Sequence, residues 1–301
     1  MPGLTLLKTA RELSEKHAFS GPRLREAIPY IQAFSGKRIV LKIGGSVLND
    51  LDLLPYLVHD VIFMKNVGIK VVLVHGGSRQ LNQEMVNQKL SVTHVDGLRV
   101  TSEKVLNLAA DVFYGISLKI KDEIEKNGYK CAIFDRNSGL VKSKLKDPKM
   151  GFVGEPQEVD ISKLDVLSED VIPVVSAITS GINPGDIGYN VNADDVAGAI
   201  AGAIKAEKLI LMTDVDGVMD KDGQLISSLS VSEVHDLIDK GIIHGGMIPK
   251  VSTCLNALDK GAGKCHIIRG GVDSFINEIL TDKGVGTEFV SDKKDSLSSA
   301  V

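Results

Sequence analysis

The sequence contains no tryptophan, and aromatic residues make up only 4% of its 301 residues. Platforms on which nucleic-acid bases could stack are therefore scarce. No charge of one sign dominates, because 35 Lys and Arg residues stand against 39 Asp and Glu residues and give a net charge of −4. Without a basic surface that could neutralise phosphates, we expect no nucleic-acid partner.

Cysteine is rare and long apolar runs are missing. The three cysteines, Cys131, Cys254 and Cys265, are far apart and form no Cys-X-X-Cys pair. Neither a disulfide framework nor a zinc site is predicted, and we interpret the three as buried, reduced thiols. No apolar run approaches the ~20 residues of a membrane-spanning helix, and the first residues lack the apolar core of a signal peptide. We expect a cytoplasmic protein without a membrane partner.

The sequence does contain glycine pairs directly after apolar strands. Residues 37–46 read KRIVLKIGGS and residues 71–78 read VVLVHGGS. Each apolar run is typical of a strand buried on both faces, and its glycine turn offers backbone N–H groups to an anion at the start of a helix. Lys42 lies two residues before the first pair, within reach of what that turn binds. A Gly-Gly pair alone is also compatible with an ordinary turn, and His75 is interpreted as a turn residue rather than a base.

These two units predict an open parallel sheet. A helical pattern at about 53–67 separates the two strands, and strand, helix and parallel strand form a βαβ unit. Ligands bind such sheets at the carboxyl ends of the strands, so the two glycine turns should share one site. Further strands are predicted at about 129–134, 171–177, 209–212, 266–269 and 286–290, and further helices at about 79–89, 102–126, 231–240 and 250–260.

Polar residues gather in the segments beside these elements. Residues 97–101 (GLRVT) place Arg99 in a loop, where it is either a solvated residue or a bidentate clamp for a carboxylate. Residues 189–195 (YNVNADD) open a helix, and Asn and Asp in that place are either helix caps or functional groups. Two further segments, LILMTDVDGV at 209–218 and GGMIPKV at 245–251, form a strand with its turn and the start of a helix.

Two other segments are interpreted as having no role in chemistry. Residues 261–264 (GAGK) only imitate a phosphate-binding P-loop, because Leu258 and Cys265 do not fit the P-loop pattern. Residues 141–155 are interpreted as a surface hairpin. Its lysines are expected to form a solvated face, and they are Lys142, Lys144, Lys146 and Lys149.

Taken in order, these six motifs resemble those of the amino-acid kinase family, and within it those of the N-acetylglutamate kinases. The resemblance covers about residues 37–290 and is specific because six motifs agree in order and spacing. It implies an α/β fold, a three-layer α/β/α sandwich with a mainly parallel open sheet and an N-terminal helical extension. The implied domains are residues 1–36 for oligomerisation and regulation, 37–177 for the acetylglutamate-binding lobe, and 178–301 for the nucleotide-binding lobe.

The resemblance implies ATP-dependent phosphorylation of the side-chain carboxylate of N-acetyl-L-glutamate to N-acetylglutamyl 5-phosphate, a step of arginine biosynthesis. Phosphoryl transfer needs positioning and cancellation of charge, which suits two lysines beside glycine turns. Mg²⁺ is expected to be held mainly by the ATP phosphates, with no metal site on the protein. The alternative is a non-catalytic arginine-sensing module related to N-acetylglutamate synthase. That module loses the phosphoryl-transfer lysines, whereas both are present here.

The resemblance also implies the roles of single residues. Lys42 and Lys250 would neutralise the transferring group, and Asp194 would orient both lysines. Arg99 and Asn190 would hold the α-carboxylate and the acetamido group of the substrate. The other implied substrate-binding residues are Gly45, Gly76 and Gly77, and the implied nucleotide-binding residues are Gly44, Thr213, Asp214, Asp216, Gly217, Val218, Gly246 and Met247.

Two departures from the family pattern lie on the substrate side. Ser78 replaces the usual third glycine after the histidine. Residues 115–118 (GISL) stand where the family pattern has a Lys and an Asn. Both departures bear on substrate choice more than on the type of reaction.

Both ends of the chain resemble the arginine-inhibited members of the family. Apolar residues at helical spacing predict two short helices, or one kinked helix, within residues 1–36. Residues 26–37 resemble the N-terminal helix that joins dimers into a hexameric ring, so a homo-oligomer, dimer or hexamer, inhibited by arginine is expected. On sequence alone Glu278 is either a solvated helix residue or a partner for a guanidinium. The implied arginine-site residues are His266, Glu278, Gly284 and Gly286.

Overall fold

The computed structural model describes residues 21–49, 53–91, 93–95, 98–282 and 284–292. The helix predicted within residues 1–20, Gly97 of the GLRVT motif and the tail from residue 293 lie outside these ranges. Helix α2 (Gly21–Phe34) confirms the helical prediction for the described part of the N-terminal extension.

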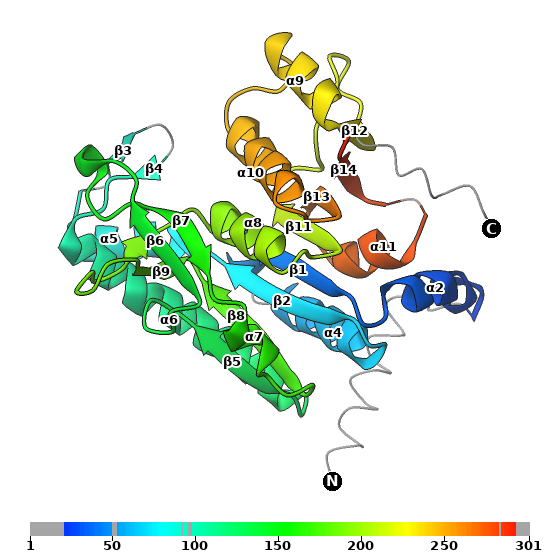
Figure 1. Ribbon diagram of the computed structural model, residues 1–301, viewed down its shortest axis with the longest axis horizontal. Coiled ribbons are helices and arrows are strands. Elements are labelled where there is room, and N and C mark those ends of the chain that lie inside the picture. Colours follow the sequence, from blue (N-terminus) through cyan, green and yellow to red (C-terminus); the bar gives the residue numbers. More distant parts are fainter. Residues whose placement is uncertain (1–20, 50–52, 92, 96–97, 283, 293–301) are drawn as a thin grey trace.

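A sheet of eight strands forms the centre of the molecule, in the order β12-β14-β13-β11-β1-β2-β8-β5 (Figure 1). Neighbouring strands are parallel except for the antiparallel pair β13 and β14. This confirms the predicted α/β class and the mainly parallel sheet. In sheet order the strands are β12 (Ser228–Ser230), β14 (Gly286–Val290), β13 (Lys264–Arg269), β11 (Lys208–Thr213), β1 (Arg38–Ile43), β2 (Lys70–His75), β8 (Val171–Ser176) and β5 (Lys130–Phe134).

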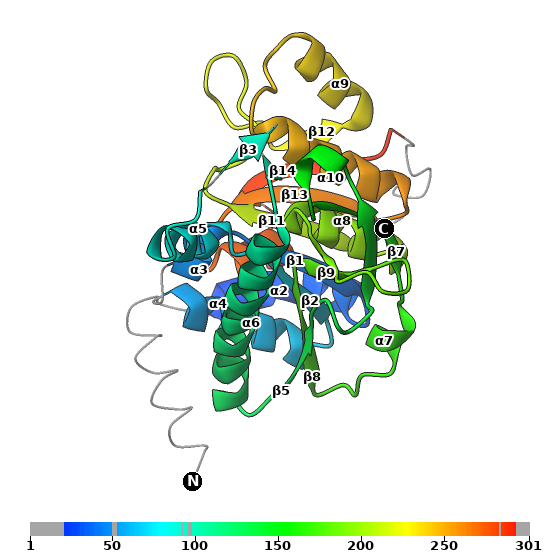
Figure 2. The ribbon, with the colours of Figure 1, turned by 90° about the vertical axis from the view of Figure 1, so that its left-hand side faces the viewer.

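Helices cover both faces of this sheet, because its strands bury side chains alternately on either side. Val40 and Val72 belong to one buried cluster, which includes residues of α8 and α10, whereas Ile39 and Val71 belong to the other, which includes residues of α4 and α11. Figure 2 shows α8 and α10 on one side of the sheet and α4 on the other. The helices are α3 (Gly45–Asn49), α4 (Leu53–Asn66), α5 (Ser78–Asn87), α6 (Glu103–Lys126), α7 (Ser162–Asp165), α8 (Ala193–Ala203), α9 (Val231–Asp239), α10 (Met247–Asp259), α11 (Ser274–Leu280) and the 3₁₀ turn η1 (Pro148–Met150).

A smaller sheet of four strands in the order β10-β9-β6-β7 lies beside the β8-β5 end of the large sheet. It contains the predicted hairpin, whose strands pair antiparallel, and it adds two short strands to it. These four strands come from both sides of the predicted lobe boundary at residue 177, and the division into two lobes stays a prediction. The bounds are β10 (Tyr189–Asn190), β9 (Ile178–Gly181), β6 (Val141–Leu145) and β7 (Gly154–Val159), and a separate pair is formed by β3 (His94–Val95) and β4 (Leu98–Arg99).

Sequence periodicity missed mainly the short elements. Helix α3 begins at Gly45, inside the glycine turn, although a helical pattern is recognisable only from about residue 51. Strands β9, β10 and β12 have two to four residues, too few for an alternation of apolar and polar side chains to stand out.

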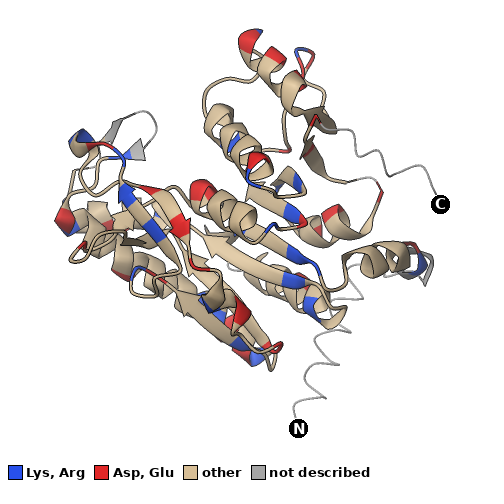
Figure 3. Cartoon of the chain, viewed as in Figure 1, with Lys and Arg blue, Asp and Glu red and all other residues tan. Residues whose placement is uncertain are grey.

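Charged side chains of both signs are interspersed over the elements on both sides of β1 (Figure 3). None of the described helices is long and apolar enough to cross a membrane.

Candidate active site

The two glycine turns lie side by side at the centre of the sheet. Strands β1 and β2 run parallel, with Lys42 opposite Val74 and Ile43 opposite His75. Strand β11 flanks β1 on the other side and places Leu211 opposite Lys42. Because parallel strands end at the same edge, the turns after β1, β2 and β11 meet there, as the sequence predicted for the two glycine turns.

A cavity of about 460 Å³ opens at this edge. It lies between the glycine turns on one side and the ends of β11 and α10 on the other. Predicted site residues that line it are Lys42, Gly44, Gly45, Gly76, Gly77, Arg99, Asn190, Thr213, Asp214 and Lys250. Other residues that line it include Ser78, Arg79, Lys146, Asn192 and Asp195.

One buried carboxylate joins the two lysines. Asp194 lies in the first turn of α8, with one oxygen 2.8 Å from Lys42 Nζ and the other 2.7 Å from Lys250 Nζ. Its side chain is only 5% exposed. Burial alone would raise the pKa of Asp194, but the charges of both lysines outweigh it and lower this pKa to about 2. An ionised Asp194 therefore holds two ammonium groups from opposite sides of the cavity.

The polar residues at the start of α8 include both a helix cap and a side chain that faces the cavity lysines. Asn192 is the cap of the helix, because its side-chain oxygen accepts a hydrogen bond from the Asp194 N–H at 3.1 Å. Asp194 itself faces the lysines and is not used as the cap. Asp195 accepts a hydrogen bond from Thr253 of α10 at 2.7 Å, which joins the two helices beside the cavity.

Two of the glycines are required by close contacts. A Cβ atom at Gly44 would come within 2.5 Å of the Met212 carbonyl oxygen of β11. At Gly77 it would come within 2.5 Å of the Phe113 ring. A side chain at either position would displace neighbouring backbone or core, so these turns present bare backbone to the cavity.

The two departures from the family pattern lie close together around the second turn. His75 is fully buried, with Nδ1 2.9 Å from the Gly76 carbonyl oxygen and Nε2 2.7 Å from the Ser117 hydroxyl. Burial lowers the pKa of His75 to about 4. His75 is the last residue of β2, directly before the turn in which it was predicted. Ser78 begins α5 and lines the cavity.

The predicted substrate clamps lie on one side of the cavity. Arg99 is buried, and its Nη2 donates to the Ser78 carbonyl oxygen at 3.3 Å. Among the described residues it forms no ion pair with a carboxylate. Asn190 donates from Nδ2 to the Thr101 hydroxyl at 3.2 Å, which ties it to the end of the GLRVT segment. Both side chains are thus held at the wall of the cavity.

Some predicted nucleotide-binding residues lie outside the cavity wall. Asp216 is paired with Arg269, at 2.5 Å between Oδ1 and Nε. The Val218 N–H donates to the Thr287 hydroxyl at 2.8 Å, and a Cβ atom at Gly217 would come within 2.5 Å of that hydroxyl. Gly246 and Met247 begin α10, which carries Lys250 into the cavity from its first turn.

Sequence reasoning assigned no site role to three charged residues that line the cavity, Arg79, Lys146 and Asp195. Lys146 of the hairpin is exposed, as interpreted, and it also lines the cavity. Composition could not reveal that the hairpin folds against α8. Arg79 could have been noticed, since it follows the second glycine turn directly at the start of a helix.

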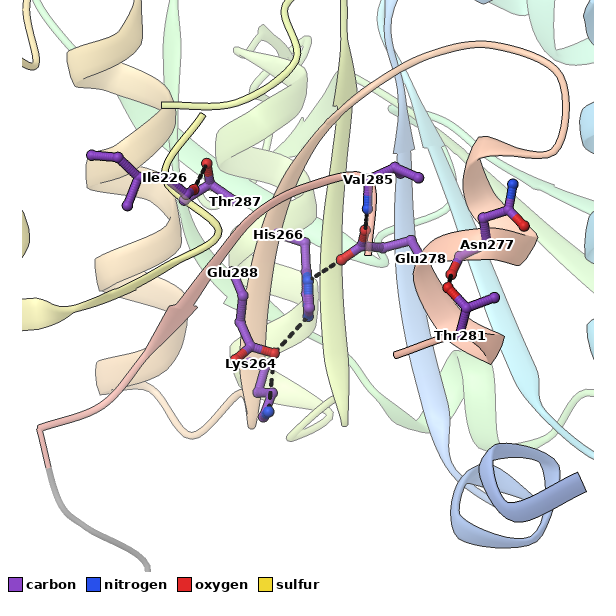
Figure 4. Close-up of polar contacts among 9 residues, drawn as sticks. All are labelled: Ile226, Lys264, His266, Asn277, Glu278, Thr281, Val285, Thr287 and Glu288. Carbon is purple, nitrogen blue, oxygen red and sulfur yellow. Dashed lines mark hydrogen bonds and ion pairs between the residues drawn. The ribbon is translucent and has the colours of Figure 1, made fainter. Parts of the chain in front are cut away.

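The predicted arginine-site residues line a second cavity of about 460 Å³. His266 Nδ1 lies 2.5 Å from a Glu278 oxygen, and the other Glu278 oxygen accepts the Val285 N–H at 2.7 Å (Figure 4). Glu278 is therefore buried and hydrogen-bonded, which excludes its reading as a solvated helix residue. Helix α2 contributes Tyr30 and Phe34 to the same cavity. The four predicted residues, His266, Glu278, Gly284 and Gly286, all line it.

Within the described ranges, no group of three or more His, Cys, Asp and Glu side chains is arranged to hold a metal ion.

Comparisons with known proteins give one family throughout. The sequence model of the "Amino acid kinase family" matches residues 37–269. An "Acetylglutamate kinase" of Geotalea daltonii is 40% identical over 281 residues, which cover 88% of this chain and 96% of that protein. An "Acetylglutamate kinase" of Ehrlichia ruminantium is 38% identical over 288 residues, which cover 89% of this chain and 88% of that protein.

A solved structure shares the fold of this chain. The N-acetylglutamate synthase from Neisseria gonorrhoeae superposes with a TM-score of 0.80 at 24% identity. The match covers 90% of this chain and 64% of the synthase chain, so this chain spans less than two thirds of that protein.

Proposed function

The chain belongs to the amino acid kinase family and is a kinase, and from this premise we propose that it phosphorylates the side-chain carboxylate of N-acetyl-L-glutamate. The phosphoryl group would come from ATP, and the product would be N-acetylglutamyl 5-phosphate, an intermediate of arginine biosynthesis. The names of relatives that are 38% and 40% identical over most of their length support this substrate.

The observation that carries the proposal is the Lys42–Asp194–Lys250 group beside two glycine turns. In transfer from a phosphoanhydride to a carboxylate, both reactants are anions, and negative charge spreads over the oxygens of the moving phosphoryl group. Two ammonium groups held by one ionised carboxylate at 2.8 and 2.7 Å are preorganised to stabilise that charge. Backbone N–H groups of the glycine turns would add neutral donors to the same oxygens.

The acceptor would bind beside the second glycine turn. The Arg99 guanidinium can bond both oxygens of the α-carboxylate, and it has no carboxylate partner among the described residues. Asn190, held by Thr101, offers an amide that matches the acetamido group of the substrate. A free glutamate or aspartate would place an ammonium group there instead.

The nucleotide would bind on the β11 side, with its phosphates towards the first glycine turn. We propose Gly44, Thr213 and Asp214 at this end, with the turn after β11 and the start of α10 beyond them. In the described part of the chain no group of three or more His, Cys, Asp and Glu side chains is arranged to hold a metal ion, and Asp195 of the cavity wall is engaged by Thr253. Mg²⁺ would therefore be held mainly by the phosphates of ATP, where it neutralises part of their charge.

We further propose that arginine binds in the second cavity and inhibits the enzyme. Glu278, Asp282 and Glu288 line this cavity and give it carboxylates that can bond a guanidinium. Tyr30 of α2 donates a hydrogen bond to Asp282, so the N-terminal extension is connected to the same place. We propose a homo-oligomer, built through this extension, that works in the cytoplasm.

The test is ADP release by the purified enzyme with ATP, Mg²⁺ and one acceptor at a time. N-Acetylglutamate should support turnover, whereas glutamate and aspartate should support little. ADP release that is equal for all three acids, or absent with N-acetylglutamate, contradicts the proposal. Binding of arginine without turnover of any acid would support the non-catalytic sensing module instead.

A further inference from the structure

An ion pair spans the active-site cavity from one side to the other. Arg79 is the second residue of α5, next to the second glycine turn, and Asp214 follows β11 on the opposite side. Arg79 Nη2 lies 3.3 Å from Asp214 Oδ2, and both residues line the cavity. The residues are 135 positions apart in the chain. The pair therefore links two walls that the sequence does not connect locally.

The Arg79 side chain extends along the first glycine turn. A Cβ atom placed on Gly45 would lie 3.5 Å from Arg79 Cδ and 3.6 Å from Arg79 Nε. The guanidinium thus sits over the turn proposed to bind phosphate. Asp214 lies near the positive charges of Arg79 and Lys250. Burial raises the pKa of Asp214, but hydrogen bonds from its own backbone N–H and from Thr213, together with these two charges, lower the pKa below its usual value.

Both partners of this ion pair are exposed to water. Its side chains are 58% and 61% exposed, and an ion pair so open to water contributes little to stability. Lys42 and Lys250 differ from Arg79 in this respect, because the carboxylate that they share is only 5% exposed. A guanidinium can donate to two phosphate oxygens at once. A polyphosphate carries more negative charge than a single carboxylate and therefore attracts the guanidinium more strongly.

We propose that Arg79 is a further nucleotide-binding residue, which leaves Asp214 when the nucleotide enters and bonds the oxygens of its terminal phosphates. In the free enzyme the Arg79–Asp214 pair closes across the cavity, and the polyphosphate replaces Asp214 as the partner of the guanidinium. The proposal deepens the proposed function and rests on it for the place of the phosphates.

The experiment is titration calorimetry of the full-length enzyme without acceptor acid, using MgATP, MgADP and AMP as probes. Arg79→Ala should weaken MgATP binding about 10- to 100-fold, the loss expected for a charge-assisted hydrogen bond. Binding of MgADP should be weakened as well, whereas binding of AMP should be weakened by less than threefold. Arg79→Lys keeps the charge but not the fork and should lie between wild type and Arg79→Ala.

A matched control is Arg38→Ala, which removes another partly exposed arginine that pairs with an aspartate, Asp165, away from this cavity. This variant should bind all three probes like wild type. The proposal is overturned if Arg79→Ala binds MgATP within twofold of wild type. It is also overturned if the affinities for MgATP and AMP fall equally. The same holds if, in a separate kinetic assay, Arg79→Ala raises only the KM for N-acetylglutamate.

Because binding is measured without turnover, the two proposals can fail separately. An enzyme that binds MgATP through Arg79 but does not phosphorylate N-acetylglutamate would contradict the proposed substrate alone. An unchanged MgATP affinity in Arg79→Ala, with wild-type turnover of N-acetylglutamate, would contradict the role of Arg79 alone.

Discussion

In the proposed function the chemistry depends on Asp194, because this residue holds a cation from each side of the cavity. An aspartate buried without partners would take up a proton, since burial raises its pKa. Here the two lysines lower the pKa of Asp194 to about 2, so the group stays ionised through the whole range in which an enzyme works. The lysines are in turn fixed in direction, and neither has to be ordered when substrate arrives.

The first prediction concerns these lysines. Lys42→Ala or Lys250→Ala should lower kcat by roughly 10²- to 10³-fold, the scale for losing one preorganised group that stabilises developing charge. The measurement is steady-state kinetics with both substrates varied. Lys240→Ala, which removes an exposed lysine of the α9 end, should leave kcat unchanged. A full kcat in Lys42→Ala, with only KM altered, would remove Lys42 from the transfer step.

The second prediction concerns the buried His75. Its folded pKa of about 4 lies below the ordinary value of 6.5, so between these values the unfolded chain binds more protons than the folded one. The free energy of unfolding should therefore fall as pH decreases from 6.5 to 4, by about 3 kcal/mol from this residue. Asp60 has the opposite effect on the free energy of unfolding. Because burial raises the pKa of Asp60 to about 8, the folded chain binds its proton more readily than the unfolded chain, and this contribution to stability grows as pH decreases.

Urea unfolding of wild type and His75→Gln at pH 7 and pH 4.5 isolates the effect of His75, since Asp60 is common to both proteins. Wild type should lose more stability than the variant on acidification. Parallel losses in the two proteins would show that His75 is not held neutral in the folded state.

At the scale of elements, the contact between α8 and α10 sets the distance between Asp194 and Lys250. The helices approach closely at glycines: a Cβ atom at Gly198 would come within 2.7 Å of Thr253 Cγ2, and one at Gly202 within 2.6 Å of Lys260 Cβ. The Thr253 hydroxyl then bonds Asp195 at 2.7 Å. Packing and one hydrogen bond therefore place Lys250 opposite Asp194.

The third prediction follows from this contact. Thr253→Val keeps the shape but removes the hydroxyl, which leaves the mostly buried Asp195 carboxylate without its donor. The free energy of unfolding should fall by about 1–3 kcal/mol, and kcat should fall with it because α10 carries Lys250. Thr253→Ser should restore both quantities. If the serine variant is impaired as much as the valine variant, the hydroxyl is not what holds the helices.

The long strands and helices could be predicted from their periodic pattern of apolar residues. The residues that directly follow these strands could then be placed as well. Lys42, Gly44 and Gly76 could be placed at one edge because parallel strands end together. The partner of Lys42, by contrast, depends on how α8 packs, and only the family resemblance pointed to Asp194. Arg79 and Asp214 could not be paired from sequence, since nothing local signals a contact over 135 positions. Lys146 is exposed, as the composition of the hairpin indicated, but its place at the cavity depends on how the hairpin folds against α8.

At the scale of the whole molecule, helix α2 and the β13–β14 end of the sheet line the same cavity. Helix α2 supplies Tyr30 and Phe34 to the cavity that also contains Glu278 of α11 and Glu288 of β14. A ligand there would contact an element outside the sheet-and-helix core as well as β13 and β14, the strands against which α10 packs with its Lys250. Differential affinity for two arrangements of these parts would let that ligand change activity.

The fourth prediction concerns assembly. If the extension joins dimers, wild type should sediment as a hexamer, and a variant lacking residues 1–25 should sediment as a dimer with a weaker response to arginine. Sedimentation and arginine titration of ADP release measure the two properties. A dimeric wild type, or a truncated hexamer with an unaltered arginine response, would contradict a role of the extension in assembly and regulation.

The central claim is that the cavity transfers a phosphoryl group from ATP to the side-chain carboxylate of N-acetylglutamate. The most direct measurement is to trap the acyl phosphate with hydroxylamine and to locate the hydroxamate by mass spectrometry, with wild type and Lys42→Ala in parallel. We predict a hydroxamate on the side-chain carboxyl of N-acetylglutamate, in amounts equal to the ADP formed, and a loss of roughly 10²- to 10³-fold in rate for Lys42→Ala. ADP formed without hydroxamate, or an equal yield of hydroxamate from free glutamate, would contradict the account.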